Sequence, residues 1–263
     1  MLTLFDHGLS PFAQKVKMAL LEKAIPFECV VPDLAAPDAR FLAASPLKEV
    51  PALIDGDVAL FQSAIIVEYL EDKWPANPIL ASDPVDRARS RTVQAMCDTQ
   101  FEAVVFSMTE FMAFKRAEGE VAQAMLAQAR KDVAHLLQWL SAQLGPRPYF
   151  NGQNFGLGDM AALPYLATAS LYKLGPASDS PLGQWFERCR QRPSFQRCQA
   201  DAKAELAGFK ESVARVQSGQ WPRQYRDHRL DWFIRSGGTE IVTAGLKAGT
   251  IRLSCLPQIH TQG

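Results

Sequence analysis

The stretch that decides the fold runs from Leu2 to Asp33 and has the sequence "LTLFDHGLSPFAQKVKMALLEKAIPFECVVPD". The apolar "LTLFDH" at its start predicts a short strand. A helix is predicted from Pro11 to Lys23, since apolar residues recur there at helical spacing. The segment from Pro26 to Asp33 is apolar and β-branched and predicts a second strand. A strand, a helix and a strand in about 30 residues form a βαβ unit, so the two strands should be parallel.

The next segment predicts a hairpin and a further helix. The apolar runs "PALI" and "VALF" flank Asp55-Gly56-Asp57, and Asp-Gly between apolar runs is a strong hairpin signal. A helix is predicted from Ser63 to Lys73, and Trp74-Pro75 should end it. Its expected buried face consists of Ile65, Ile66, Tyr69 and Leu70. Residues 1–76 are therefore expected to form a small α/β domain.

After Pro84 the pattern changes to long segments with helical periodicity and no strand signals. Helices are predicted over residues 84–115, 119–144, 157–174, 181–191 and 193–215. Residues 84–215 should form an all-helical domain, and Pro75 to Pro84, which contains three prolines, should be the linker. The predicted fold class is thus α/β plus all-α. Residues 216–263 form a C-terminal extension that is too apolar to be simply disordered. It is expected to pack on the body of the protein, over a cleft, and its role stays open.

The composition limits the partners. The 263 residues contain 28 Lys plus Arg and 28 Asp plus Glu, and this balance removes the usual reason to expect nucleic acid or an anionic membrane. The arginine-rich stretch from Arg188 to Arg197 is expected to be a solvated helix face. Five widely spaced cysteines without a C-x-x-C pair argue against a disulfide framework and a zinc site. No signal peptide and no apolar run of about 18 residues is visible, so a soluble cytoplasmic protein is expected.

Ser10 is the first candidate for chemistry. Pro11 suits the first position of a helix, so Ser10 falls at the N-cap, and ordinary capping is one explanation for it. The second explanation starts from its position at the carboxyl end of a parallel strand, where open α/β sheets bind ligands. The helix start favours an anion there, and a hydroxyl could donate a hydrogen bond to a thiolate.

Two further motifs can each be explained either as ordinary structure or as part of a ligand site. Val50-Pro51 at the entry to a strand is either an edge-strand proline or a cis peptide bond in a functional turn, with the main chain of Val50 free to pair with a peptide-like ligand. Gln62-Ser63 lies where the hairpin turns into a helix. Ser63 is either a second cap or part of a site for a carboxylate.

Taken together and in order, these three motifs resemble the glutathione-binding domain of the cytosolic glutathione transferase superfamily. "SPFAQKVKMAL" is most similar to the serine-type and omega-like members, and "NFGLGDMAALPYL" (Asn154 to Leu166) resembles the capping box of their helical domain. The resemblance covers about residues 1–210. It implies that the first domain is thioredoxin-like and that Asp159 is a folding element.

The chain departs from the family pattern at several positions. Gln62 stands where the family usually has Glu, so an amide replaces the carboxylate that meets the ligand's amino group. Glu49 stands where Lys or Gln is usual, and Lys48 is expected to compensate. Gly156 replaces the Ser or Thr that usually begins the capping box.

The resemblance implies a mechanism. Glutathione is the expected co-substrate, with no metal, and it should be bound by Lys48, Val50, Pro51, Gln62 and Ser63. Its sulfur should lie at Ser10, which stabilises the thiolate for attack on a small hydrophobic electrophile. Since serine cannot form a mixed disulfide, conjugation, displacement or isomerisation is favoured over thiol–disulfide exchange. The second substrate is expected between the domains, against Phe12, Phe106 and Phe111, with Phe101, Met108 and Met112 as further candidates; at helical spacing these residues could equally be core.

Alternatives remain open. One is glutathione-dependent cleavage of an aryl ether or a carbon–halogen bond, suggested by the 216–263 extension. Another is a non-catalytic binding protein of the same fold, suggested by Glu49 and Gln62. The resemblance also implies a homodimer formed through the linker and the 84–115 helix, and a detoxification role. His7 and His135 are assigned no catalytic role.

Overall fold

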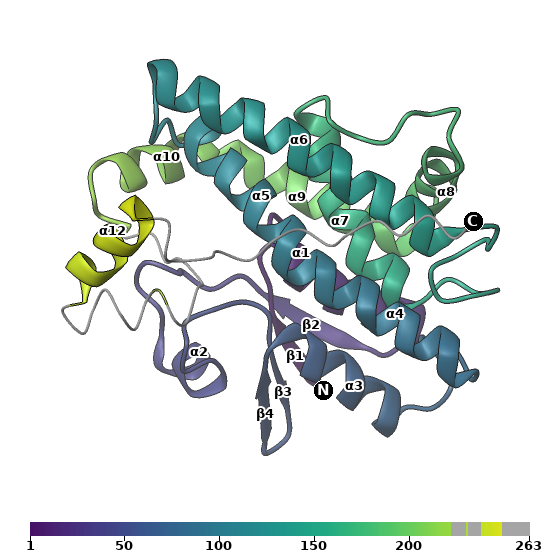
Figure 1. Ribbon diagram of the computed structural model, residues 1–263. Coiled ribbons are helices and arrows are strands. Elements are labelled where there is room, and N and C mark those ends of the chain that lie inside the picture. The colour runs from purple at the N-terminus through teal and green to yellow at the C-terminus, as the bar shows by residue number, and fades with distance from the viewer. Residues whose placement is uncertain (222–229, 231–237, 249–263) are drawn as a thin grey trace.

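The computed structural model describes residues 1–221, 230 and 238–248, and Figure 1 shows its two parts, a sheet with its helices and a layer of longer helices. The first part contains β1 (Leu2–Phe5), α1 (Pro11–Glu22), β2 (Phe27–Val30), α2 (Ala39–Ala44), β3 (Ala52–Asp55), β4 (Val58–Phe61) and α3 (Ser63–Lys73). The second part contains α4 (Pro84–Met96), α5 (Glu102–Met108), α6 (Gly119–Leu144), α7 (Leu157–Leu171), α8 (Pro181–Arg190), α9 (Pro193–Glu205), α10 (Phe209–Gln217) and α12 (Thr239–Lys247).

The sheet has the strand order β2-β1-β3-β4. β1 and β2 are parallel, with Leu2 opposite Phe27, which confirms the predicted βαβ unit. β3 runs antiparallel to both β1 and β4, which confirms the hairpin around Gly56. β2 is shorter than the predicted strand from Pro26 to Asp33 and lies at the sheet edge, where Glu28 and Cys29 are exposed.

Side chains of the sheet alternate between two faces, as the pleat requires. Leu2, Leu4 and Leu53 point into the large core that the sheet shares with α1 and α3. Phe5 and Ala52 point the other way, into a smaller core under α2. There the rings of Phe5 and Phe41 lie 5.2 Å apart. The predicted buried face of α3 is wrong at Ile65, which is 56% exposed, because the helix turns Ile66, Val67 and Leu70 inward instead.

Helix α1 lies between the sheet and the helical part and packs against α3, α7 and α9. It is therefore buried on nearly all sides, and even Lys15 and Lys17 are withdrawn from water. A buried ammonium group needs a charged or polar partner. Both lysines find carboxylates from the helical part, Asp98 and Asp201, so the two parts meet through polar as well as apolar contacts.

The helical part confirms the predicted all-helical class, with two corrections to the segments. The predicted helix over residues 84–115 contains two π-helical turns, η1 (Cys97–Phe101) and η2 (Thr109–Ala113). The predicted helix over residues 193–215 is broken by a 3₁₀ turn, η3 (Leu206–Gly208). π turns are frequent at functional sites, and η1 faces α1 and α7 where the two parts meet.

Asp159 is the anchor of the helical core. Its buried carboxylate accepts hydrogen bonds from the main-chain N–H groups of Phe150 at 2.9 Å and Gly156 at 3.0 Å, and from the indole N–H of Trp185 at 2.7 Å. Burial raises the pKa of Asp159 to about 6, against the pull of these donors. Gly156 has no side chain, so only the half of the capping box that Asp159 supplies can form.

The 216–263 extension lies largely outside the described residues, which exclude 222–229, 231–237 and 249–263. Its described start packs on the body. Val216 is buried, and the amide of Gln217 donates to the carbonyl of Phe114 at 3.4 Å. Just before it, Arg215 of α10 lies 3.5 Å from the carboxylate of Asp33, on the loop between β2 and α2.

Candidate functional site

Ser10 lies at the carboxyl end of β1 and caps α1. Its hydroxyl oxygen accepts a hydrogen bond from the N–H of Ala13 at 3.3 Å, and Pro11 takes the first helical position, so the capping interpretation is confirmed. A serine hydroxyl has one donor as well as two acceptor sites. Capping uses only an acceptor site, and the side chain is half-buried. The hydroxyl hydrogen therefore remains available to an anion at the helix start, and the two explanations for Ser10 are compatible.

The turn before β3 is shaped around Val50-Pro51. The peptide bond between them is cis, as one of the two explanations required. The sheet ladder begins only at Ala52. Within residues 1–221, 230 and 238–248, no hydrogen bond reaches the main-chain N–H or C=O of Val50, although the residue is buried. Buried main-chain groups are nearly always paired, so this donor and acceptor suit an extended peptide-like ligand.

The start of α3 is the third part of the site. Gln62 precedes the helix with a φ of 74°, in the left-handed region that costs a non-glycine residue energy. In the part of the chain that the structure describes, α3 has no side-chain cap at Gln62, so its first N–H groups are open to a ligand, and the buried Ser63 stands at the first helical position. Open N–H groups with a neighbouring hydroxyl favour a carboxylate.

A small cavity joins these parts. It is shallow, opens to solvent, and is lined by Phe12, Glu49, Val50, Pro51, Phe61, Gln62 and Ser63. It brings together four of the predicted glutathione-binding residues with Phe12. Lys48 is exposed, with a φ of 58°, and does not line this cavity, whereas Glu49 does. Ser10 lies two residues before Phe12, just outside the lining.

The predicted apolar substrate residues separate in the structure. Phe12 is half-buried at the cavity and half-buried Phe106 lies on α5, whereas Phe111 is buried in a core cluster with Met108 and Ala129. Beside Phe12 the structure places a group that sequence reasoning missed. The ring of Tyr165 from α7 meets Phe12 edge-on at 6.3 Å.

The same group contains a buried ion pair. Lys15 contacts the carboxylate of Asp98 from η1, and the Tyr165 hydroxyl donates to that carboxylate at 3.4 Å. Burial lowers the pKa of Lys15 although Asp98 opposes the shift. Lys15 of α1 and Asp98 of η1 thus form a buried ion pair where the two parts of the protein meet, and the rings of Phe12 and Tyr165 lie beside it. No local pattern in the sequence indicates this pairing, because Lys15 and Asp98 lie 83 residues apart.

His7 and His135 have different surroundings. His7 Nδ1 lies 2.7 Å from the carboxylate of Glu205, at the end of α9, so it is engaged across the domain junction. His135 lies half-buried on α6. Glu205 is a second residue that sequence reasoning missed.

The cysteines are poor candidates for thiolate chemistry. Desolvation raises the pKa of Cys29 to about 11 and that of Cys198 to about 12, and it also raises the pKa values of Cys97 and Cys189. Only a thiolate is an effective nucleophile. Among these four thiols, none is activated.

The arginine-rich stretch makes contacts within the chain. Arg188 donates to the carbonyl of Pro148, Arg190 pairs with Glu187, Arg192 with Glu22 and Arg197 with Asp201. In the described part of the chain, no helix is long and apolar enough to cross a membrane. Nor do its His, Cys, Asp and Glu side chains gather anywhere in a group that could hold a metal ion.

Comparison with known proteins assigns both parts of the chain to domains of one protein family. Residues 4–78 match the family model of the glutathione S-transferase N-terminal domain, and residues 101–193 match that of the C-terminal domain. A relative from Nicotiana tabacum, the probable glutathione S-transferase parC, is 31% identical over 206 residues, which cover 75% of this chain and 89% of that protein.

Two solved structures are similar along most of their length. A glutathione S-transferase from Methylobacterium radiotolerans, in complex with glutathione sulfonate, is 29% identical with a TM-score of 0.64, covering 75% of this chain and 93% of that one. A Tau class glutathione S-transferase from mango is 25% identical with a TM-score of 0.65, covering 78% of this chain and 97% of that one. The narrower expectation of a serine-type or omega-like member stays a prediction.

Proposed function

The chain belongs to the glutathione transferase superfamily and is a transferase, and on this premise we propose that it binds glutathione in the cavity between Phe12 and Ser63 and activates its thiol at Ser10. The observation that carries the proposal is the hydroxyl of Ser10, which caps α1 as an acceptor, so that its donor is not used by capping, and which lies two residues before Phe12 of the cavity lining.

The residues present fit a peptide thiol. The N–H and C=O of Val50, which have no hydrogen-bond partner among the described residues, suit the main chain of an extended tripeptide. The uncapped start of α3 and Ser63 suit a carboxylate, and Gln62 offers an amide where the ligand's amino group would be met. The solved relative that carries glutathione sulfonate supports glutathione as the ligand.

Ser10 would act as a thiolate stabiliser. A free thiol has a pKa near 8.5, so only about 3% is ionised at pH 7. Making it mostly ionised means lowering that pKa by about two units, which needs about 2.7 kcal/mol of differential stabilisation. A charge-assisted hydrogen bond from Ser10, together with the N-terminus of α1, can supply that amount.

The electrophile is a small hydrophobic molecule, and an aryl halide is a suitable probe. The thiolate sulfur forms a bond to the carbon that carries the halogen, and the halide leaves with the bonding electron pair. The thiol proton passes to water. The half-buried ring of Phe12, which lines the cavity and packs on the buried ring of Tyr165, supports an aromatic second substrate.

The decisive experiment compares two serine caps of the same kind. Ser180 precedes Pro181 and accepts from the N–H of Gly183 at 3.0 Å, so it caps α8 as Ser10 caps α1. Both Ser10→Ala and Ser180→Ala should lose about 1 kcal/mol of stability. Only Ser10→Ala should raise the pKa of the bound thiol, followed through the ultraviolet absorbance of the thiolate, and reduce turnover. Glutathione affinity, measured by calorimetry, should change less than a few-fold.

Two results would contradict the proposal. Equal thiol pKa values and turnover in the two variants would remove Ser10 from the chemistry. Absence of any heat of binding at millimolar glutathione would favour a non-catalytic protein of the same fold.

We also propose that the protein is a cytoplasmic homodimer, as is typical of the family. Apolar side chains at Ile65 on α3 and Val85 on α4 are 56% and 53% exposed, and the pair between Arg91 and Glu68 holds these two helices together. Light scattering of the purified protein tests the proposal, and a monomer at micromolar concentration would refute it.

A further inference from the structure

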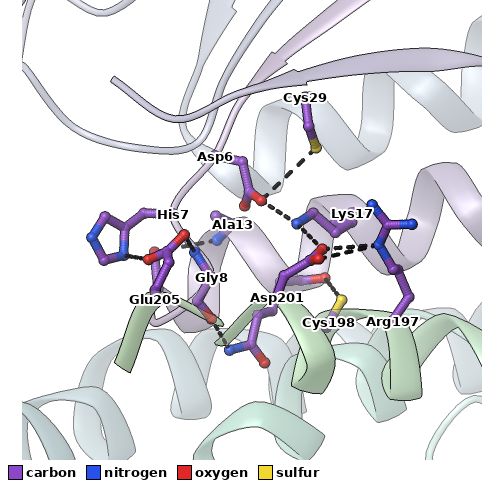
Figure 2. A network of polar contacts seen from close by, with 12 residues as sticks. Asp6, His7, Gly8, Ala13, Lys17, Cys29, Arg197, Cys198, Asp201 and Glu205 are labelled. Carbon is purple, nitrogen blue, oxygen red and sulfur yellow. Dashed lines mark hydrogen bonds and ion pairs between the residues drawn. The ribbon is translucent and has the colours of Figure 1, made fainter. Parts of the chain in front are cut away.

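The loop that delivers Ser10 is held by a helix from the other end of the chain. Figure 2 shows the carboxylate of Glu205, the last residue of α9, against the imidazole of His7 and the main chain of Gly8. One oxygen accepts a hydrogen bond from the N–H of Gly8 at 2.6 Å, and the other lies 2.7 Å from Nδ1 of His7. Hydrogen bonds from His7 and Gly8 lower the pKa of Glu205 although burial opposes the shift, so the carboxylate is charged at neutral pH.

The same loop is fixed from the side of α1. The side-chain amide of Gln14 donates to the carbonyl of Gly8 at 2.6 Å, and the N–H of Ser10 donates to the carbonyl of His7 at 2.8 Å. Gly8 is thus held through its N–H by α9 and through its C=O by α1. Only Leu9 lies between Gly8 and Ser10, so little freedom remains in the main chain between them.

The approach of α9 to the loop leaves no room for a side chain. A Cβ on Gly8 would lie 2.9 Å from the main-chain nitrogen of Ala202, closer than real Cβ contacts. Beside it, Lys17 of α1 contacts both Asp6 of the loop and Asp201 of α9, the latter at 2.8 Å. Hydrogen bonds that the Lys17 ammonium donates to these carboxylates raise the pKa of Lys17 despite its burial. The contact between loop and helix is therefore close and charged.

We propose that Glu205 is a positioning residue: anchored on α9, its carboxylate holds the main-chain N–H of Gly8 and the imidazole of His7 and thereby sets where the Ser10 hydroxyl lies. The inference rests on the proposed role of Ser10 in stabilising the thiolate. On this proposal the helical domain takes part in thiol activation through Glu205, which contacts the loop before α1 and does not line the cavity.

A direct electrostatic role of Glu205 makes the opposite prediction. A negative charge near a thiolate destabilises it, so loss of the charge alone would lower the thiol pKa. Loss of a positioning contact would raise it, because the Ser10 donor would no longer be held in place. The sign of the change therefore distinguishes the two roles.

The experiment uses the full chain with three substitutions at one position. Glu205→Ala removes both contacts, and Glu205→Gln keeps an acceptor for the Gly8 N–H. Glu205→Asp keeps the charge but shortens the reach by about 1.5 Å. Glu211→Ala, at an exposed glutamate in the first turn of α10, is the matched control. The readouts are the pKa of glutathione's thiol in the complex, the turnover of an aryl halide, and glutathione affinity by calorimetry.

The substitutions are expected to differ in how strongly they affect the thiol pKa and turnover. Glu205→Ala and Glu205→Asp should raise the thiol pKa and lower kcat by about tenfold, since misplacement of a catalytic group is costly. Glutathione affinity should stay within a few-fold, because Val50 and Ser63 are untouched. Glu205→Gln should retain most of the activity, and Glu211→Ala should match the wild type.

The inference is overturned if Glu205→Asp, or a folded Glu205→Ala, leaves the thiol pKa unchanged or lowers it. Should Glu205→Ala fail to fold, Glu205→Asp alone decides. Ser10→Ala, measured beside them, separates the two proposals: an unchanged thiol pKa there refutes the role of Ser10, whereas a raised pKa there with a normal value in Glu205→Asp refutes only the role of Glu205.

Discussion

The carboxylate of Glu22, at the end of α1, receives two hydrogen bonds from the guanidinium group of Arg192, just before α9, at 2.9 and 2.6 Å. Ser194 donates to the same carboxylate. Together with the contacts of Lys17 and Glu205, this pair shows that charged groups connect α9 and the residue before it to the middle and end of α1 and to the loop that precedes α1. The ring of Phe155 lies 4.3 Å from the guanidinium carbon and completes the junction.

The Glu22 pair predicts a pH-dependent stability. Burial raises the pKa of Glu22, but the hydrogen bonds from Arg192 and Ser194 outweigh it and bring the pKa below its ordinary value. Since the folded pKa lies below the unfolded one, the stabilisation is complete above the ordinary glutamate pKa and is lost as the pH falls through the folded value. Wild type should exceed Glu22→Gln by about 1 to 2 kcal/mol at pH 7 in urea unfolding. The difference should shrink below about pH 4.5, and a constant difference would contradict the prediction.

Asp159 should be the most sensitive carboxylate for stability. Asp159→Ala leaves the buried donors of Trp185, Phe150 and Gly156 without an acceptor, which should cost at least about 3 kcal/mol. Asp159→Asn keeps one acceptor oxygen and should cost less. Urea unfolding followed by tryptophan fluorescence measures both, and Glu187→Ala, at an exposed glutamate on α8, is the control. Similar midpoints for Asp159→Ala and the control would refute the anchoring role.

Two glycines give a matched pair for the contact between loop and helix. Gly8→Ala places a Cβ against the main chain of α9 and should destabilise the protein by about 1 to 3 kcal/mol. Gly208→Ala meets no atom within 4 Å and, with a φ of −88°, needs no special backbone freedom, so it should be nearly neutral. Thermal unfolding measures both. Gly8→Ala as stable as Gly208→Ala would show that α9 can move away from the loop at little cost.

The buried pair of Lys15 and Asp98 should respond unequally to its two deletions. Asp98→Ala leaves a buried ammonium without its carboxylate, which should cost about 3 kcal/mol or more. Lys15→Met should cost less, since the Asp98 side chain is 16% exposed and can turn to water. The double variant should recover part of the loss seen in Asp98→Ala. Denaturant midpoints of the three proteins test this, and strict additivity would exclude the coupling.

Gln62 offers a gain of function. Gln62→Glu places a carboxylate where the ligand's amino group would be met and should strengthen glutathione binding by about threefold, as an exposed charge pair allows. A glutathione analogue without the α-amino group should show no such gain. Calorimetry with both ligands measures the two affinity changes. An equal gain in affinity for glutathione and the analogue would show that residue 62 does not meet the amino group.

Most of the fold could be predicted from sequence patterns that span a few residues. The hairpin around Gly56 and the helix from Ser63 to Lys73 were predicted correctly, because turn residues and helix stops act over a few positions. Helix α2 was missed, since "ARFLAA" spans only six residues and shows less than two turns of periodicity. The π turns η1 and η2 were missed for another reason: their residues are ordinary helix formers, and packing at the domain junction determines the extra residue in each turn.

The residues of the candidate site also differ in whether a local sequence pattern indicates them. Val50, Pro51, Gln62 and Ser63 could be predicted as site residues because each lies at a turn or a helix start with a local signal. The structure brings these four to one cavity, and their role in binding stays a prediction. Glu205, Tyr165 and Asp98 carry no such signal, since each acts on α1 or its loop from far along the chain. The placement of Phe111 in the core, rather than at this cavity, likewise depends on how the helices pack.

The hydrogen bond between Gly8 and Glu205 spans 197 residues. During synthesis the first strands and helices can leave the ribosome and fold long before residue 205 is made. Until then the segment next to Ser10 lacks the partner that fixes its amide. A nascent or prematurely terminated chain would therefore present the thiol pocket without a tightly held hydroxyl, and competence for chemistry would arrive only when the end of α9 emerges.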